Sequence, residues 1–155
     1  MHEVRWNYGN AVSDETIRAV ESRLGIVFPA DYRDVVSRHD GGRPRPHAVD
    51  LPSGREVVLE RLLPLDADRG EDVVQTAALL RGRGAWRLVP FARDPFGNFF
   101  CFRCARHGPD AIVYWEHETG GVTTICKTFS DLLASLHFPR GGSTSDRAVR
   151  GSEPT

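Results

Sequence analysis

Apolar residues recur at helical spacing in two stretches near the start of the chain. The first stretch lies between Ser13, whose side chain can accept backbone N–H bonds, and Gly25. The second opens at Pro29, which suits the first turn of a helix, and stops at the Asp40-Gly41-Gly42 turn. Both patterns predict amphipathic helices. Their expected buried faces are Ile17, Val20 and Leu24, and then Tyr32, Val35 and Val36.

Apolar and polar residues then alternate with a period of two, which is typical of strands. Residues 46–50 and 55–60 flank a Leu51-Pro52-Ser53-Gly54 turn and predict a hairpin. Further candidate strands lie at 86–92, 98–104, 111–117 and 122–127. The turns that connect them are too short for crossover helices, so we expect antiparallel neighbours.

Two of these strands have features that predict their position in the sheet. Residues 98–104 carry apolar side chains on both faces, which predicts a central strand that is covered on both sides. Pro90 cannot donate a ladder hydrogen bond, so its strand belongs at an edge or at a bulge.

Two more helices complete the pattern. A polar, mostly acidic loop over 66–72 leads into a short helix with the apolar residues Val73, Val74, Ala77 and Leu80. The last helix starts near Thr128, ends at Pro139 and buries Phe129, Leu132, Leu133 and Leu136. The predicted fold class is α+β: N-terminal helices, an antiparallel sheet of about six strands with a short helical insertion, and a C-terminal helix. We expect a single domain over 1–138 and a disordered polar tail over 139–155.

Length, composition and charge narrow the class of protein. The chain has 155 residues, a formal net charge of −1 and, apart from Lys127, only arginines as its strongly basic residues. Its apolar runs fall far short of the ~20 residues that cross a bilayer, and a near-neutral chain lacks the basic field of a non-specific nucleic-acid binder. The arginines at 42–45 and 82–84 are too few to change that expectation. The N-terminus lacks a secretory signal and the cysteine count is odd, so we expect a cytoplasmic protein without a disulfide framework.

Two groups of residues carry candidate chemistry. Cys101 and Cys104 form a C-x-x-C pair, but a structural zinc site needs four ligands, and a strand points residues three apart to opposite faces. We therefore interpret them as buried core cysteines and expect neither a metal nor a cofactor. The segment 115–118, Trp-Glu-His-Glu, ends a strand without the spacing of a metalloprotease motif. It is either a solvated strand end or a recognition surface anchored by an aromatic side chain.

Five segments, taken in order, resemble one known family. They are 24–32, 39–44, 89–102, 111–118 and 129–133. Together they resemble the SUKH superfamily, specifically its Smi/Knr-like group, over about residues 13–138. Asp40 stands where that group frequently has asparagine, and Arg103-Cys104 stands where an acidic residue is usual.

The resemblance implies an α+β domain without enzymatic activity. Bacterial members are mostly immunity proteins, made beside a secreted polymorphic toxin that they bind and block, whereas fungal relatives regulate cell-wall synthesis and signalling as interaction proteins. We therefore expect an immunity protein that binds and occludes a cognate toxin, with a regulatory interaction scaffold as the alternative. Neither direct nucleic-acid binding nor membrane binding is expected, and the oligomeric state stays open. The candidate partner-contact residues are Asp94, Asn98, Trp115, Glu116 and Glu118.

Overall fold

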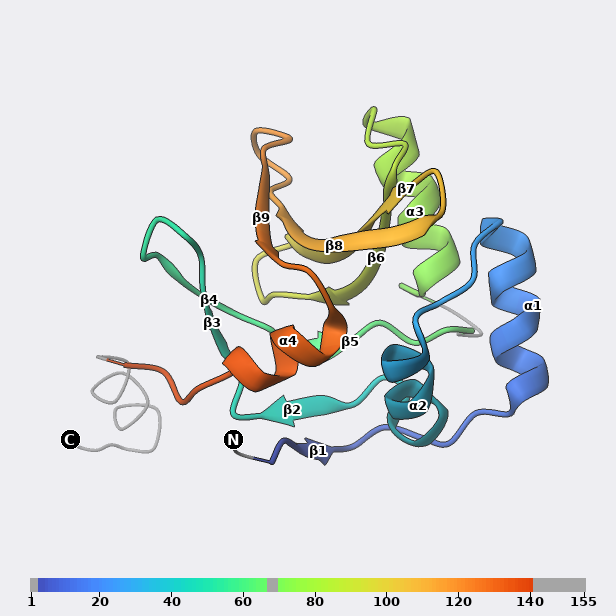
Figure 1. Cartoon of the computed structure of the whole chain (residues 1–155), viewed down its shortest axis with the longest axis horizontal. Coiled ribbons are helices and arrows are strands. Elements are labelled where there is room, and N and C mark those ends of the chain that lie inside the picture. Colours follow the sequence, from blue (N-terminus) through green and yellow to red (C-terminus); the bar gives the residue numbers. More distant parts are fainter. Residues whose placement is uncertain (1–2, 67–69, 141–155) are drawn as a thin grey trace.

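A computed structural model describes residues 3–66 and 70–140 and has the α+β class that the sequence predicts (Figure 1). Its helices are α1 (Asp14–Leu24), α2 (Ala30–His39), α3 (Val73–Gly82) and α4 (Phe129–Ser135). Its strands are β1 (Arg5–Asn7), β2 (Arg43–Arg45), β3 (Ala48–Asp50), β4 (Glu56–Val58), β5 (Arg61–Leu62), β6 (Leu88–Arg93), β7 (Phe99–Ala105), β8 (Gly108–Trp115) and β9 (Val122–Cys126). Most of the tail predicted to be disordered, 141–155, and part of the predicted acidic loop, 67–69, lie outside the described residues.

The helices form where the local sequence signals predict them. The Ser13 hydroxyl accepts a backbone N–H bond of 3.1 Å at the start of α1, and Gly25 takes a left-handed φ of 74° at its end. Asp72 and Thr128 cap α3 and α4 in the same way, while α2 follows Pro29 directly. These bonds satisfy backbone groups that the ends of a helix leave free. None of the helices in the described ranges combines the length and apolar character that crossing a bilayer requires.

The main sheet has five antiparallel strands in the order β5-β6-β7-β8-β9. The apolar strand β7 is therefore central, as its two-faced pattern predicts. The register between β6 and β7 shifts between Pro90 and Ala92, which confirms the bulge predicted at the proline.

The predicted hairpin forms as β3–β4, but it is a separate two-stranded ribbon instead of part of a larger sheet. The chain changes partner just after β4. Leu59 N donates to His47 O within the ribbon, whereas Glu60 N donates to Arg93 O in the main sheet. The pattern of the sequence does not predict β1, β2 or β5, because strands of two or three residues are too short to show alternation.

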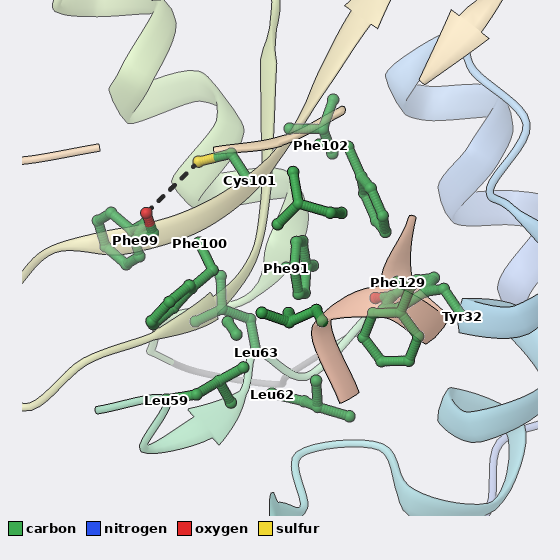
Figure 2. Close-up of a cluster of buried hydrophobic side chains, with 14 of the residues drawn as sticks. Tyr32, Leu59, Leu62, Leu63, Phe91, Phe99, Phe100, Cys101, Phe102 and Phe129 are labelled. Carbon is green, nitrogen blue, oxygen red and sulfur yellow. Dashed lines mark hydrogen bonds between the residues drawn. The ribbon is translucent and has the colours of Figure 1, made fainter. Parts of the chain in front are cut away.

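Aromatic side chains fill the face of the main sheet that lies toward α2 and α4. The ring of Tyr32 meets those of Phe102 and Phe129 edge-on, with centroids 5.2 Å and 5.4 Å apart. Phe91 stacks on Phe102 at 4.5 Å. Figure 2 shows these rings beside three buried leucines of the β4–β5 segment, Leu59, Leu62 and Leu63. Such pairs add to the free energy of apolar burial, so this cluster joins both helices to the sheet.

The opposite face of the sheet carries Phe99, Cys101 and Trp115, because side chains alternate along each strand. Helix α3 covers this face and lies against β6 (Figure 1). Phe99 stacks on Trp115 with centroids 6.1 Å apart, and Arg83, just past α3, holds its guanidinium 5.4 Å from the centroid of the Trp115 ring. The prediction that β7 is covered on both sides is thereby confirmed.

Candidate functional site

The sequence candidates come together at one end of the main sheet, where the β6–β7 turn meets the β8–β9 loop. Asp94 begins the turn and its Oδ1 accepts the backbone N–H bonds of Phe96 and Asn98, both at 2.8 Å. Its Oδ2 accepts bonds from the Asn98 side-chain amide at 2.9 Å and from the Tyr114 hydroxyl at 2.6 Å. We call Asp94, Asn98 and Tyr114 the polar hub. All three are buried, so the hub fixes the shape of the turn from inside.

The hub also holds the neighbouring loop. The Asn98 Oδ1 accepts the His117 backbone N–H at 3.0 Å, and its amide nitrogen donates to the Tyr114 hydroxyl at 3.0 Å. Burial raises the pKa of Tyr114, as does its bond to Asp94, so the hydroxyl stays protonated and remains a donor. Gly97, in the turn between Asp94 and Asn98, has a φ of 89°. A Cβ at this position would lie 3.4 Å from the His117 ring. Buried and mutually bonded, Asp94 and Asn98 offer no free polar atoms to a partner.

The other three candidate contact residues differ in how far their side chains are exposed to solvent. Trp115 is buried under Arg83, whose Nη2 donates to the His117 carbonyl at 2.7 Å. Glu116 is half-buried and accepts a bond of 3.0 Å from Arg55, on the β3–β4 ribbon. Glu118 is exposed in the β8–β9 loop. Partner contact through Glu116 and Glu118 remains a prediction, while Trp115 shapes the surface beside it.

That surface is a cleft. The sequence does not predict that the two exposed apolar residues lining it lie together. Trp86, in the α3–β6 connection, exposes 72% of its surface, and Val122, at the start of β9, exposes 51%. With Trp115 they line a hollow of about 410 Å³, which we call the Trp86 cleft. The position of Trp86 after a Gly-Arg-Gly-Ala stretch is the only signal in the sequence, and Val122 has none.

The Trp86 cleft has a basic wall. Arg83 and Arg87 line the hollow, and Arg81 precedes them near the end of α3. The guanidinium of Arg83 is held by the Trp115 ring and by the His117 carbonyl, so it is oriented before any partner arrives. An exposed tryptophan beside arginines, one of them held in place, is the chemistry that dominates protein-binding hot spots.

The family model described as the SMI1 / KNR4 family (SUKH-1) matches residues 11–135. The chain belongs to this family. The match spans α1 to α4 and contains the polar hub and the Trp86 cleft, whereas β1 lies outside it. No curated protein matches the chain.

Within the described part of this SUKH-1 chain, one group of residues could hold a metal ion. Possible ligand atoms of Asp50, Glu56 and His137 lie within 4.8 Å of one another. Arg140 already donates to the Asp50 Oδ1 at 2.7 Å, and His137 Nε2 lies 3.0 Å from the same oxygen. The bond from Arg140 lowers the pKa of the Asp50 carboxyl. The group therefore acts as an ion-pair cluster that fastens the segment after α4 to the β3–β4 ribbon.

The cysteines of the SUKH-1 chain are free thiols. Burial raises the pKa of the Cys101 thiol well above its usual range and also raises that of Cys104. It raises the pKa of Cys126 to about 11. Metal binding and redox chemistry use the thiolate, so these environments favour packing over reactivity.

Proposed function

We propose that this chain is a non-enzymatic immunity protein that acts in the cytoplasm by binding a cognate secreted polymorphic toxin and occluding it. Support comes first from the SUKH-1 match over residues 11–135, because domains of this family are commonly immunity proteins to such toxins. The match does not name the toxin or the face that binds it. We therefore infer the binding face from the exposed residues of the chain.

The observation that carries the proposal is the Trp86 cleft. Trp86 exposes 72% of its surface in a chain that otherwise buries most of its large aromatic side chains. Burying an aromatic side chain of this size removes on the order of 200 Å² of surface from water, which is the largest apolar contribution that one residue makes to an interface. Arg83 and Arg87 beside it favour a toxin surface that offers carboxylates around an apolar protrusion.

Rigid support under the cleft favours tight binding. The polar hub holds the β6–β7 turn and the β8–β9 loop together. Arg83, at the end of α3, donates to the His117 carbonyl. A partner then orders few side chains when it docks, which lowers the entropic cost of association. In the proposed mechanism the toxin is neutralised by steric coverage of its active or substrate-binding surface, and no residue of this chain takes part in a reaction.

Co-expression tests the proposal. We expect cells that produce the toxin domain encoded beside this gene to grow when the chain is co-expressed and to stop growing without it. The two proteins should also co-purify as a stable complex. A toxin domain of unrelated sequence is the control and should not be neutralised. If the gene has no adjacent toxin, or if co-expression gives no protection, the immunity function is wrong. A pull-down that returns only other cellular proteins would instead support the regulatory scaffold.

A further inference from the structure

We infer that the solvent face of the β1–β2 ribbon is a second binding surface, which takes an extended acidic segment of a partner protein. The inference deepens the proposed function, since it names the chemistry of a toxin segment, and it rests on that function only for the identity of the partner. The surface lies apart from the polar hub in the fold, at the ribbon near the N-terminus (Figure 1).

The ribbon presents arginines in register on one face. Arg5 of β1 lies directly opposite Arg45 of β2, and Asn7 lies opposite Arg43. These four side chains are exposed, whereas Trp6 and Pro44 between them turn inward. Each strand has three residues, so its exposed face holds no other side chain. Like charges directly opposite each other destabilise a strand pair, so an arrangement of this kind calls for an acidic partner.

In the described part of the chain, no acidic side chain neutralises the facing arginines Arg5 and Arg45. Within residues 3–66 and 70–140, no carboxylate lies within ion-pair distance of Arg5 or Arg45. Arg43 has only a long contact of 3.7 Å to Glu60. By contrast, arginines such as Arg93 and Arg140 bind carboxylates at 2.6 Å and 2.7 Å. The ribbon arginines therefore keep donors available for an incoming carboxylate.

Two hollows border the ribbon and share two of its side chains, and we call them together the groove. One, of about 490 Å³, is lined by Arg5, Arg45 and the apolar side chains of Leu136 and Phe138. The other, of about 270 Å³, lies beyond it, and the two share Asn7 and Arg45. A segment that follows the ribbon would thus pass over the arginines and place side chains into both hollows.

One exposed aromatic ring lines each hollow of the groove. Tyr8 exposes 81% of its surface and Phe138 exposes 60%. Guanidinium groups lie over both rings, that of Arg43 at 5.9 Å from the Tyr8 centroid and that of Arg45 at 5.6 Å from the Phe138 centroid. Among the described residues, Tyr8 is the non-glycine residue with a positive φ, 60°. Strain of this kind persists where the surrounding structure enforces it and is typical of binding sites.

The spacing of the arginines defines the ligand. Arg43 and Arg45 are two residues apart on one face of a strand, so their attachment points are separated by ~6.6 Å. In an extended peptide with acidic residues at alternate positions, the attachment points of successive acidic side chains are separated by the same distance. Each of its carboxylates can then accept charge-assisted bonds from one guanidinium.

A peptide fits this groove better than a nucleic acid does. Glu3 and Glu60 line the two hollows and repel any anion placed beside them. A phosphate backbone carries a charge at every nucleotide and cannot avoid them, whereas a peptide can place neutral residues there. Each exposed ring already has a guanidinium over it, which competes with base stacking. A peptide can place its acidic side chains over the arginines and its apolar side chains beside Phe138.

Fluorescence anisotropy with the whole chain tests the inference. The probe is a fluorescein-labelled octapeptide with glutamate at alternate positions, and the control peptide has the same composition with its glutamates adjacent. We expect saturable binding of the alternating peptide, and weaker binding of the control. Arg5→Gln and Arg45→Gln should each weaken binding about fivefold to tenfold, the effect of losing one charge-assisted contact. Arg23→Gln, at an exposed arginine of α1, should leave binding unchanged.

Three results would overturn the inference. They are the absence of saturable binding, binding of the peptide by both arginine variants with the wild-type affinity, and displacement of the peptide by an eight-nucleotide RNA that binds more tightly. Because both arginines are exposed and face each other, their variants should unfold at the wild-type temperature or slightly above it, which separates lost binding from lost folding. The toxin-protection assay is independent of this titration. Protection without peptide binding would remove this inference alone, whereas peptide binding without protection would remove the proposed function and leave the surface intact.

Discussion

Two buried tyrosines show how differently the two halves of this protein are stabilised. In the polar hub the Tyr114 hydroxyl donates to Asp94 and accepts from Asn98. In the aromatic cluster the Tyr32 hydroxyl has no hydrogen-bond partner among the described residues, although its ring meets Phe102 and Phe129 edge-on. Burial raises the pKa of both hydroxyls. The same side chain is thus an anchor for loops in one region and an apolar ring in the other.

Two buried aspartates repeat the contrast. Asp94 accepts four hydrogen bonds within the hub. Among the described residues, the carboxylate of Asp40, which follows α2, accepts one, from the Leu65 backbone N–H at 2.9 Å. Burial accordingly raises the pKa of Asp40 to about 6. The hub residues are therefore needed for the fold, whereas Asp40, which stands where the resembled group frequently has asparagine, carries a charge that the fold tolerates at a cost.

The largest effect should come from Asp94→Ala. It leaves the Tyr114 hydroxyl, the Asn98 amide and two backbone N–H groups without their acceptor. We expect the free energy of unfolding to fall by about 3–4 kcal/mol, measured by urea denaturation. Asp34→Ala, which removes an exposed pair with Arg38, should change it by less than about 0.5 kcal/mol. Similar losses for the two variants would contradict the structural role of the hub.

Asp40→Asn should have a smaller effect that depends on pH. The folded-state pKa of about 6 lies above the ordinary value of 3.8, so the wild type loses stability as the pH rises through this range. An asparagine can still accept the Leu65 bond without carrying a charge. We expect it to raise the free energy of unfolding by about 2 kcal/mol at pH 7.5 and to change little near pH 4. Urea denaturation at both pH values checks this, and an equal effect at both would show that charge is not the cause.

Removing each tyrosine hydroxyl in turn should give the smallest changes and the sharpest contrast. Tyr114→Phe deletes two bonds of the hub, and we expect a loss of about 1.5 kcal/mol. Tyr32→Phe deletes a hydroxyl without a partner among the described residues, so stability should stay within about 0.5 kcal/mol or rise. Thermal unfolding of both variants decides between the two environments. Equal losses would mean that the Tyr32 hydroxyl also has a bonded role.

Features with a local signal could be predicted from the sequence, and features that depend on distant pairing could not. Ser13 and Thr128 each cap a helix through a bond to the residue three positions later, so the helices follow from short stretches. The Asp94–Asn98 turn is also local, but its bond to Tyr114 needs the β7–β8 register, in which Phe100 pairs with Tyr114. For this reason Asp94 and Asn98 look like contact residues in the sequence and are buried in the structure.

The candidate binding surfaces were harder to predict for the same reason. Trp86 lies in the α3–β6 connection and Val122 begins β9, so the two line one hollow only because the fold brings the end of α3 next to Trp115. The ribbon strands β1 and β2 come from distant parts of the chain, and neither alternates apolar and polar residues long enough to be recognised. Surfaces of this kind follow from tertiary packing, which single-sequence patterns do not report.

The affinity of the toxin for Trp86→Ala tests the central claim most directly, because it separates binding from folding. In titration calorimetry with the toxin domain encoded beside the gene, we expect wild-type binding and a loss of about thirtyfold for Trp86→Ala, as for an interface hot spot. Val122→Ala should weaken binding less, and Val27→Ala, an equally conservative change at a distant exposed valine, should not weaken it. All three variants should unfold at nearly the wild-type temperature. Unchanged affinity of Trp86→Ala would contradict the cleft as the docking site, and the absence of wild-type binding would contradict the immunity function itself.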